Sequence, residues 1–260
     1  MASQLRFKGI VLRKTKLGEA DLIITFLVED GSSVQAVAKG ARKPKSSFSS
    51  RLELFSCAEI FCAQSKGLPL IQEARLCDSH QGLRIDFDKA TASSVVAEVM
   101  AKSIHEEVPC PRLFALAEAA FHHLELAEST QIYSIALATC LKVFAFTGLR
   151  PSFAQCVACG ADIFGPSAPE HVALSHPEGG CLCPECSGSY EVIREQGSLI
   201  QWLHVFLYST FDQVKETPAP EPVLSFGFHF VQEWSRMHMG ACIKSIPFLL
   251  TNANFPSREC

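Results

Sequence analysis

The sequence predicts an α+β protein, in which a small N-terminal β module is followed by an all-helical domain carrying an inserted cysteine-rich segment. Three observations lead to this prediction. Residues 1–80 contain short β-branched runs separated by turn signals, and helical spacing of apolar residues starts at about residue 88. Residues 152–190 hold five cysteines and show no sustained periodicity. We therefore expect domains at 1–80 and 81–260, with the insertion at about 152–190.

The N-terminal module is expected to contain five short strands. The run from Val34 to Lys39 alternates with period two, and Glu29-Asp30-Gly31 and Lys66-Gly67 are turn signals. Strands of this number and length suit a small closed or sandwich-like β module, of which the OB barrel is one option. The expected strands cover about 9–12, 22–27, 34–39, 52–62 and 70–74.

The remainder of the chain is expected to be helical outside the insertion. An apolar stripe at positions i, i+3, i+4, i+7 and i+8 begins at Ala92, and the Pro109-Cys110-Pro111 sequence ends that helix. The central helix is apolar nearly all round and ends at Gly148, with Pro151 shortly after. Further helices are expected at about 112–127, 131–147, 199–214 and 226–239.

Charge is distributed unevenly along the chain. Up to Arg51 there are ten Lys and Arg residues against four Asp and Glu, a net charge of +6, whereas the remaining residues carry −10. A basic N-terminal module joined to an acidic body indicates that the N-terminal module meets an acidic partner.

The start of the chain has no apolar signal segment, so we expect a cytoplasmic protein whose twelve cysteines stay reduced. The longest apolar stretch, 132–149, contains Lys142 and several hydroxyl residues, which indicates a buried helix and no membrane span.

Two CxxC pairs, Cys156 with Cys159 and Cys183 with Cys186, predict one structural zinc ion. Two residues between thiolates allow a single tight turn to aim both sulfurs at one ion, and two such turns complete a tetrahedron. Four thiolates leave no open coordination position, so catalysis by this metal is not expected. The spacing leaves three competing ligands open, namely Cys181, His171 and His176.

Two basic runs in the N-terminal module predict a DNA-binding surface. Residues 39–51, which we call the basic segment, contain no acid. Its part from Lys39 to Ser47 includes Gly, Pro and Ser, so we expect a mobile loop there that follows a phosphate backbone. Phe48, Phe7 and Phe26 are candidates for stacking on bases, although core positions are the commoner use of single aromatics. The candidate DNA-binding residues are Lys39, Arg42, Lys43, Lys45, Arg13, Lys14, Lys16 and Arg51.

The residues leave two further classes of function open. The first is a zinc-ribbon adaptor whose basic module binds an acidic protein instead of DNA. The second is a metal-dependent nuclease that uses Glu19 and Asp21, for which no third ligand stands at helpful spacing. The chain has no HExxH, GxSxG or GxGxxG motif, and we do not expect an enzyme.

Several segments resemble the RecO family of bacterial DNA repair proteins. The Gly148-Leu149-Arg150-Pro151 turn ahead of the paired cysteines follows the same order. The N-terminal segments that carry the resemblance are Gly9 to Leu12, Gly18 to Ile24, Ala38 to Ser46 and Leu52 to Phe55.

The resemblance implies an N-terminal OB-fold barrel and a helical domain with a zinc finger. It implies a non-enzymatic recombination mediator that binds single- and double-stranded DNA and anneals complementary strands. The implied partners are RecR and the acidic C-terminal tail of single-strand-binding protein, and the implied outcome is the loading of RecA.

Among the candidate residues, those that match the family's basic loop inherit its DNA role: Lys39, Arg42, Lys43 and Lys45. The other four rest on charge alone. The chain departs from the family at 47–50, where Ser47-Phe48-Ser49-Ser50 stands in place of a further basic residue. The pocket for the acidic tail has no linear motif, so no residues are assigned to it.

Overall fold

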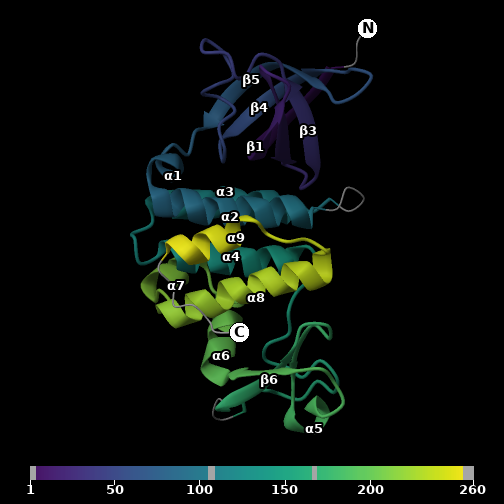
Figure 1. Cartoon of the computed structure of the whole chain (residues 1–260), viewed down its shortest axis with the longest axis vertical. Helices are drawn as coiled ribbons and strands as arrows, with labels where there is room; N and C mark the ends of the chain where they lie inside the picture. The colour runs from purple at the N-terminus through teal and green to yellow at the C-terminus, as the bar shows by residue number, and fades with distance from the viewer. Residues whose placement is uncertain (1–3, 105–108, 166–168, 254–260) are drawn as a thin grey trace. The chain divides into compact units, whose positions relative to one another are not determined.

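A computed structural model describes residues 4–104, 109–165 and 169–253 of the chain, so positions 166–168 of the expected insertion lie outside the described part. The chain divides into two compact units, Met1–Leu126 and Ala127–Cys260. Figure 1 labels all the helices and most of the strands of the two units, which are described separately below.

The first unit contains the predicted five-stranded barrel. Its strands are β1 (Gln4–Leu17), β2 (Asp21–Val28), β3 (Ser33–Ala38), β4 (Cys57–Ala63) and β5 (Leu70–Asp78), and they close in the order β1-β2-β3-β5-β4. All neighbours are antiparallel except β3 and β5, which pair in parallel. A closed barrel of this size and strand order is typical of the OB fold.

The barrel has an apolar interior, which is formed by every second side chain along each strand. Alternate residues of β1 and β2 turn inward, and the rings of Phe7 and Phe26 meet edge to face with centroids 5.4 Å apart. A register shift between Val11 and Arg13 marks a bulge in β1. The expected fourth strand begins at Cys57 instead of residue 52, because the preceding residues form turns and Phe55 has a φ of +71°.

Three helices belong to the same unit as the barrel: α1 (Gly82–Ile85), α2 (Phe87–Ser103) and α3 (Pro111–Leu126). The Asp86 side chain caps α2 by accepting the Lys89 backbone N–H. On α3, the Glu118 carboxylate pairs with Lys8 of β1, with 2.7 Å between Nζ and Oε1. The compact unit thus extends beyond residue 80, where we expected the domain boundary.

The second unit is built on the central apolar helix α4 (Ile132–Phe146), which is buried on nearly all sides. Gly227 of helix α8 (Glu221–Met239) lets α8 approach α4, because a Cβ atom there would lie 2.3 Å from Leu137 Cδ2. Trp234 donates its indole N–H to the Leu149 carbonyl at 2.9 Å. The other long helices are α6 (Gly197–Tyr208), α7 (Phe211–Glu216), α8 (Glu221–Met239) and α9 (Ser245–Asn252).

Residues 199–214 form two helices, although the sequence led us to expect one. The break lies at Ser209 and Thr210, both with extended backbone, and Thr210 starts α7 with a capping box that uses Gln213. Hydroxyl residues at these positions favour caps over helix interiors, which is the physical reason for the break.

The inserted segment, together with the residues directly after it, contains a small sheet that the sequence did not reveal. Its strands β6 (His171–Ser175), β7 (Gly180–Leu182) and β8 (Ile193–Gln196) pair in the order β7-β6-β8, and the short helix α5 (Pro184–Ser187) follows β7. Across the described residues, no helix is both long and apolar enough to cross a membrane.

Candidate metal centre and nucleic-acid interface

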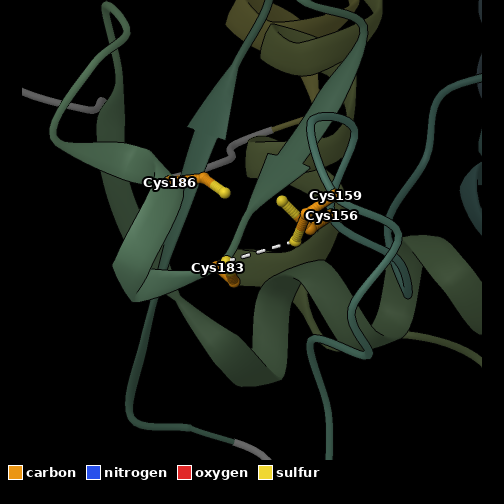
Figure 2. A group of neighbouring side chains, drawn as sticks. All are labelled: Cys156, Cys159, Cys183 and Cys186. Carbon is orange, nitrogen blue, oxygen red and sulfur yellow. Dashed lines mark hydrogen bonds between the residues drawn. The ribbon is translucent and has the colours of Figure 1, made fainter.

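The four cysteines of the two CxxC pairs converge in the inserted segment, as Figure 2 shows. The sulfurs of Cys156, Cys159, Cys183 and Cys186 all lie within 4.8 Å of one another. Cys159 Sγ and Cys183 Sγ are 3.7 Å apart. Four sulfurs at this separation can surround a single tetrahedral ion.

The local backbone explains how each pair aims two sulfurs at one point. Gly160 has a φ of +78° and donates its N–H to the Cys156 carbonyl at 2.8 Å, which closes a tight turn around the first pair. In the second pair, Cys183 stands at the N-cap of α5, and Cys186 donates its N–H to the Cys183 carbonyl at 3.1 Å. One helical turn therefore brings both sulfurs to the same side.

The electrostatics of the cluster favour bound cationic charge. Burial raises the pKa of the Cys156 thiol, but hydrogen bonds from the facing backbone, first from Cys183, outweigh it and lower that pKa to about 6. The pKa of Cys186 is raised to about 12, first by its hydrogen bonds with the sulfurs of Cys183 and Cys159. Protons shared among crowded sulfurs are what a divalent ion displaces when it binds. The donor set therefore fits a metal.

The three competing ligands lie outside this cluster. Cys181 is fully buried, and burial raises its pKa to about 12. His171 is exposed, with its Nε2 3.9 Å from a Glu170 carboxylate oxygen. His176 packs its ring 5.4 Å from the ring of Phe230. The CxxC cysteines thus remain the candidate ligands.

The basic segment is a series of turns between β3 and β4. Within it, the Lys43 N–H donates to the Gly40 carbonyl and the Ser46 N–H donates to the Lys43 carbonyl, both at 3.0 Å. Gly40 has a φ of +66°, which explains the glycine after Lys39.

The start of the basic segment is held against the turn between β1 and β2. The Arg42 guanidinium donates to the Glu19 carbonyl at 2.8 Å, and the Arg42 backbone N–H donates to the Ala20 carbonyl at 3.0 Å. The Gly40 N–H donates to the Asp21 carboxylate at 2.8 Å. The expectation of a mobile loop is therefore wrong for this part, because backbone groups of two separate turns are bonded to each other.

The eight candidate DNA-binding residues fall into two groups. Three have side chains bonded within the barrel: Arg42 as described, Lys14 to the Glu53 carboxylate at 2.8 Å, and Arg51 to the Ala74 carbonyl at 3.4 Å. The other five have exposed side chains with no hydrogen bond or ion pair to any residue that the structure describes. They are Arg13, Lys16, Lys39, Lys43 and Lys45.

The pairing register of β1 with β2 shows on which face of the sheet the cations of β1 lie. Lys16 stands opposite Leu22 and Lys14 opposite Ile24, so both share the face whose β2 side chains turn into the barrel. Leu22 in turn pairs with Ala38, directly before the basic segment. Arg13 stands opposite Thr25 on the other face. Lys16 therefore lies at the end of the β1–β2 hairpin that is next to the start of the basic segment, and Arg13 lies three residues further from that end.

The aromatic candidates for stacking are part of the barrel interior. Phe7 and Phe26 are core residues, and Phe48 of the basic segment packs against that core from its edge. An aromatic that we did not single out, Phe61 on β4, has the guanidinium carbons of Arg6 and Arg75 at 5.2 and 4.9 Å from its ring centroid. The period-two alternation of β4 was the signal for its outward position.

Glu19 and Asp21 do not form a metal site in this structure. The Asp21 carboxylate accepts the Gly40 N–H, and Glu19 accepts the Arg42 guanidinium through its backbone carbonyl. The second group of ligating side chains among the described residues is Asp78, His80 and Glu125. The His80 imidazole is 3.0 Å from the Glu125 carboxylate, which also accepts the Gly82 N–H at 2.7 Å. These bonds tie the end of β5 to α3, and the sequence spacing gave no sign of them.

Comparison with known proteins gives matches along most of the chain. Residues 1–80 match the family model described as "Recombination protein O N terminal", and residues 84–246 match "Recombination protein O C terminal".

Curated relatives agree with these matches. The DNA repair protein RecO of Bifidobacterium adolescentis is 29% identical over 250 residues, which cover 93% of this chain and 97% of that protein. The protein of the same name from a Nocardioides species is 32% identical over 234 residues, covering 88% of this chain and 84% of that protein. The one from Rubrobacter xylanophilus is 33% identical over 181 residues, covering 70% and 71%.

Proposed function

This chain belongs to the RecO family of DNA repair proteins, and from that premise we propose that it is a DNA-binding recombination mediator. In this proposal it anneals complementary strands and helps to load RecA onto single-stranded DNA coated with single-strand-binding protein. The reaction is binding and displacement, with no covalent step.

The observation that carries the proposal is a group of lysines beside the barrel's closed sheet. Lys39, Lys43 and Lys45 of the basic segment have exposed side chains without partners in the described chain, and Lys16 lies at the end of the β1–β2 hairpin that is next to the start of this segment. Unpaired ammonium groups keep their full charge available for phosphate, whereas a lysine in an ion pair must first give up its carboxylate.

The bonded cations are assigned a supporting part. Arg42 holds the basic segment on the β1–β2 turn, and Arg51 and Lys14 bond within the barrel. Fixing the backbone in advance lowers the entropy lost when DNA binds, so these residues position the lysines. Arg13 contributes to the electrostatic field around the barrel from its other face.

We assign DNA binding to residues 1–80, and the metal-bearing body to residues 81–260. A set of four thiolates with tetrahedral spacing fits zinc best, and we propose one structural Zn²⁺ on Cys156, Cys159, Cys183 and Cys186. The ion would stabilise the insertion, whose own apolar cluster is small.

The proposed partners follow from the family role. They are single- and double-stranded DNA, RecR, and the acidic C-terminal tail of single-strand-binding protein. Work on bacterial chromosomal DNA would place the protein in the cytoplasm.

A salt titration of binding to a labelled single strand tests the proposal. Four lysine–phosphate contacts predict a log–log slope of the association constant against salt near −2.8, at about −0.7 per contact. Absence of binding, or a slope near zero, would contradict the DNA-binding proposal and favour an adaptor that binds an acidic protein. Cleavage of the strand in Mg²⁺ or Mn²⁺ by the pure protein would instead favour a nuclease.

A further inference from the structure

A cleft of about 450 Å³ lies in the second unit, between the start of the inserted segment and α6. Its lining combines two charged side chains, Arg150 and Asp162, with the rings of His204 and Tyr208. Cavities of this size hold small organic ligands. Neither the proposed zinc site nor the basic segment uses these four residues.

The wall formed by α6 is aromatic. His204 and Tyr208 are one helical turn apart, and their ring centroids are 5.0 Å apart. The ring of Phe164 continues this row at 6.1 Å from His204. Burial lowers the pKa of His204, which favours the neutral ring. Tyr208 is 60% exposed, so one large aromatic face is left to solvent.

The lining also contains a cation that has no partner among the described residues. Arg150 is exposed, and its side chain makes no hydrogen bond or ion pair with the residues that the structure describes. The turn that presents it is fixed, because Gly148 adopts a φ of +84° and the Leu149 carbonyl accepts the Trp234 indole N–H. The backbone directly before this lining arginine is therefore anchored to α8.

Asp162 gives the cleft an acceptor as well as a cation. Its backbone pairs with Gln155 in an isolated β-bridge, and both residues belong to the lining. A carboxylate accepts hydrogen bonds from the ring N–H of thymine or uracil and from the exocyclic amine of the other bases, and a guanidinium binds phosphate. Exposed aromatic rings provide stacking surfaces for bases of any sequence.

We propose that this cleft holds one unpaired nucleotide of a DNA single strand, with its base on Tyr208 and His204 and its phosphate on Arg150. The ligand is a single strand because a base within a duplex is covered on both faces by its neighbours. The inference rests on the proposed function and adds to it a second strand contact outside the barrel.

Photocrosslinking of the full-length protein tests this directly. The probe is a thymine-rich single strand in which 5-iodouracil replaces thymine, and crosslinked residues are located by mass spectrometry. We expect crosslinks at Tyr208 or His204. Tyr208→Ala lowers the yield on α6 about five-fold or more, as expected for loss of a stacked base, whereas Tyr208→Phe retains it. Arg150→Ala also lowers the yield.

The matched control is Tyr190→Ala, which removes another exposed tyrosine of the second unit, 40% exposed and outside the cleft lining. It should leave the yield on α6 unchanged. Crosslinks confined to residues 13–51, or an α6 yield indifferent to both Tyr208→Ala and Arg150→Ala, would overturn the cleft while leaving the barrel proposal intact. A wild-type protein that neither binds nor crosslinks the strand would overturn both.

Discussion

At the scale of single residues, cations that look alike in the sequence have different roles. Arg42 and Lys43 are neighbours in one basic run. The Arg42 guanidinium donates to the carbonyls of Gly18 and Glu19, whereas the exposed Lys43 ammonium has no partner among the described residues. Charge runs could be predicted from the sequence. Which member is bonded could not, because the acceptors lie more than twenty residues away in the chain.

This difference predicts that alanine substitutions at Arg42 and Lys43 change the free energy of unfolding by different amounts. Arg42→Ala should lower the free energy of unfolding by about 1 kcal/mol, because it removes charged hydrogen bonds that join two turns. Lys43→Ala should leave it unchanged within about 0.5 kcal/mol, since an exposed, unpaired lysine contributes little. Urea denaturation of both variants measures the two values. Equal losses would contradict the assignment of Arg42 as an anchor.

At the scale of elements, the apolar periodicity of the sequence predicted the barrel strands and the long helices, and it did not predict the short strands of the inserted segment. The strands β6, β7 and β8 have at most five residues each, too few for a period to emerge. The CxxC pairs predicted the convergence of their four cysteines, because the spacing alone defines each turn. The Arg150–Tyr208 cleft was not predictable, since it depends on how α6 packs against the inserted segment.

The inserted element should depend on its metal. Cys156→Ser should lose the ion and melt at a lower temperature, since a closed thiolate site contributes free energy of folding. The matched control is Cys77→Ser, which changes an exposed cysteine outside the cluster. Elemental analysis and thermal melts of both variants provide the check. A Cys156→Ser protein with its metal content unchanged would refute the assignment.

The end of α6 offers a pH-dependent prediction. Lys142 of α4 donates to the carbonyls of Phe206 and Leu207, and burial lowers its pKa from 10.5 to about 8. Between pH 8 and 10.5 the unfolded chain therefore binds more protons at this residue than the folded chain does. The contribution of Lys142 to stability consequently rises with pH across this window.

The measurement compares wild type with Lys142→Met in urea at pH 7.5 and at pH 10. The difference in unfolding free energy should shift in favour of the wild type at the higher pH by about 1–3 kcal/mol. Cysteine ionisation affects both proteins alike and cancels in the difference. A constant difference would show that Lys142 keeps its proton throughout.

At the scale of the whole molecule, the sequence predicted the order of the parts. The barrel, the helical body and the cysteine insertion follow in the predicted order. The three helices after the barrel belong to its compact unit, which runs to Leu126. The Lys8–Glu118 ion pair is one of the contacts that join these helices to the barrel, and its two residues are 110 positions apart in the chain.

The whole chain should carry one metal ion in its native state. Elemental analysis of the purified protein should find about one zinc per chain, because one closed four-thiolate cluster is expected to bind one ion. Removal by a chelator should lower the melting temperature without abolishing strand binding, since the basic segment lies in the other unit. Loss of binding in parallel with zinc would show that the inserted segment, whose start lines the Arg150–Tyr208 cleft, contributes more to strand binding than the basic segment does.

The central claim is that the lysines of the basic segment bring DNA strands together, and strand annealing tests it most directly. Lys43→Glu combined with Lys45→Glu should slow annealing of complementary strands about ten-fold or more, with an unchanged melting temperature. The control, Lys66→Glu combined with Lys102→Glu, changes the net charge equally at exposed lysines elsewhere and should anneal at nearly the wild-type rate. If both double variants anneal at the wild-type rate, or both slow it equally, the basic segment is not the site.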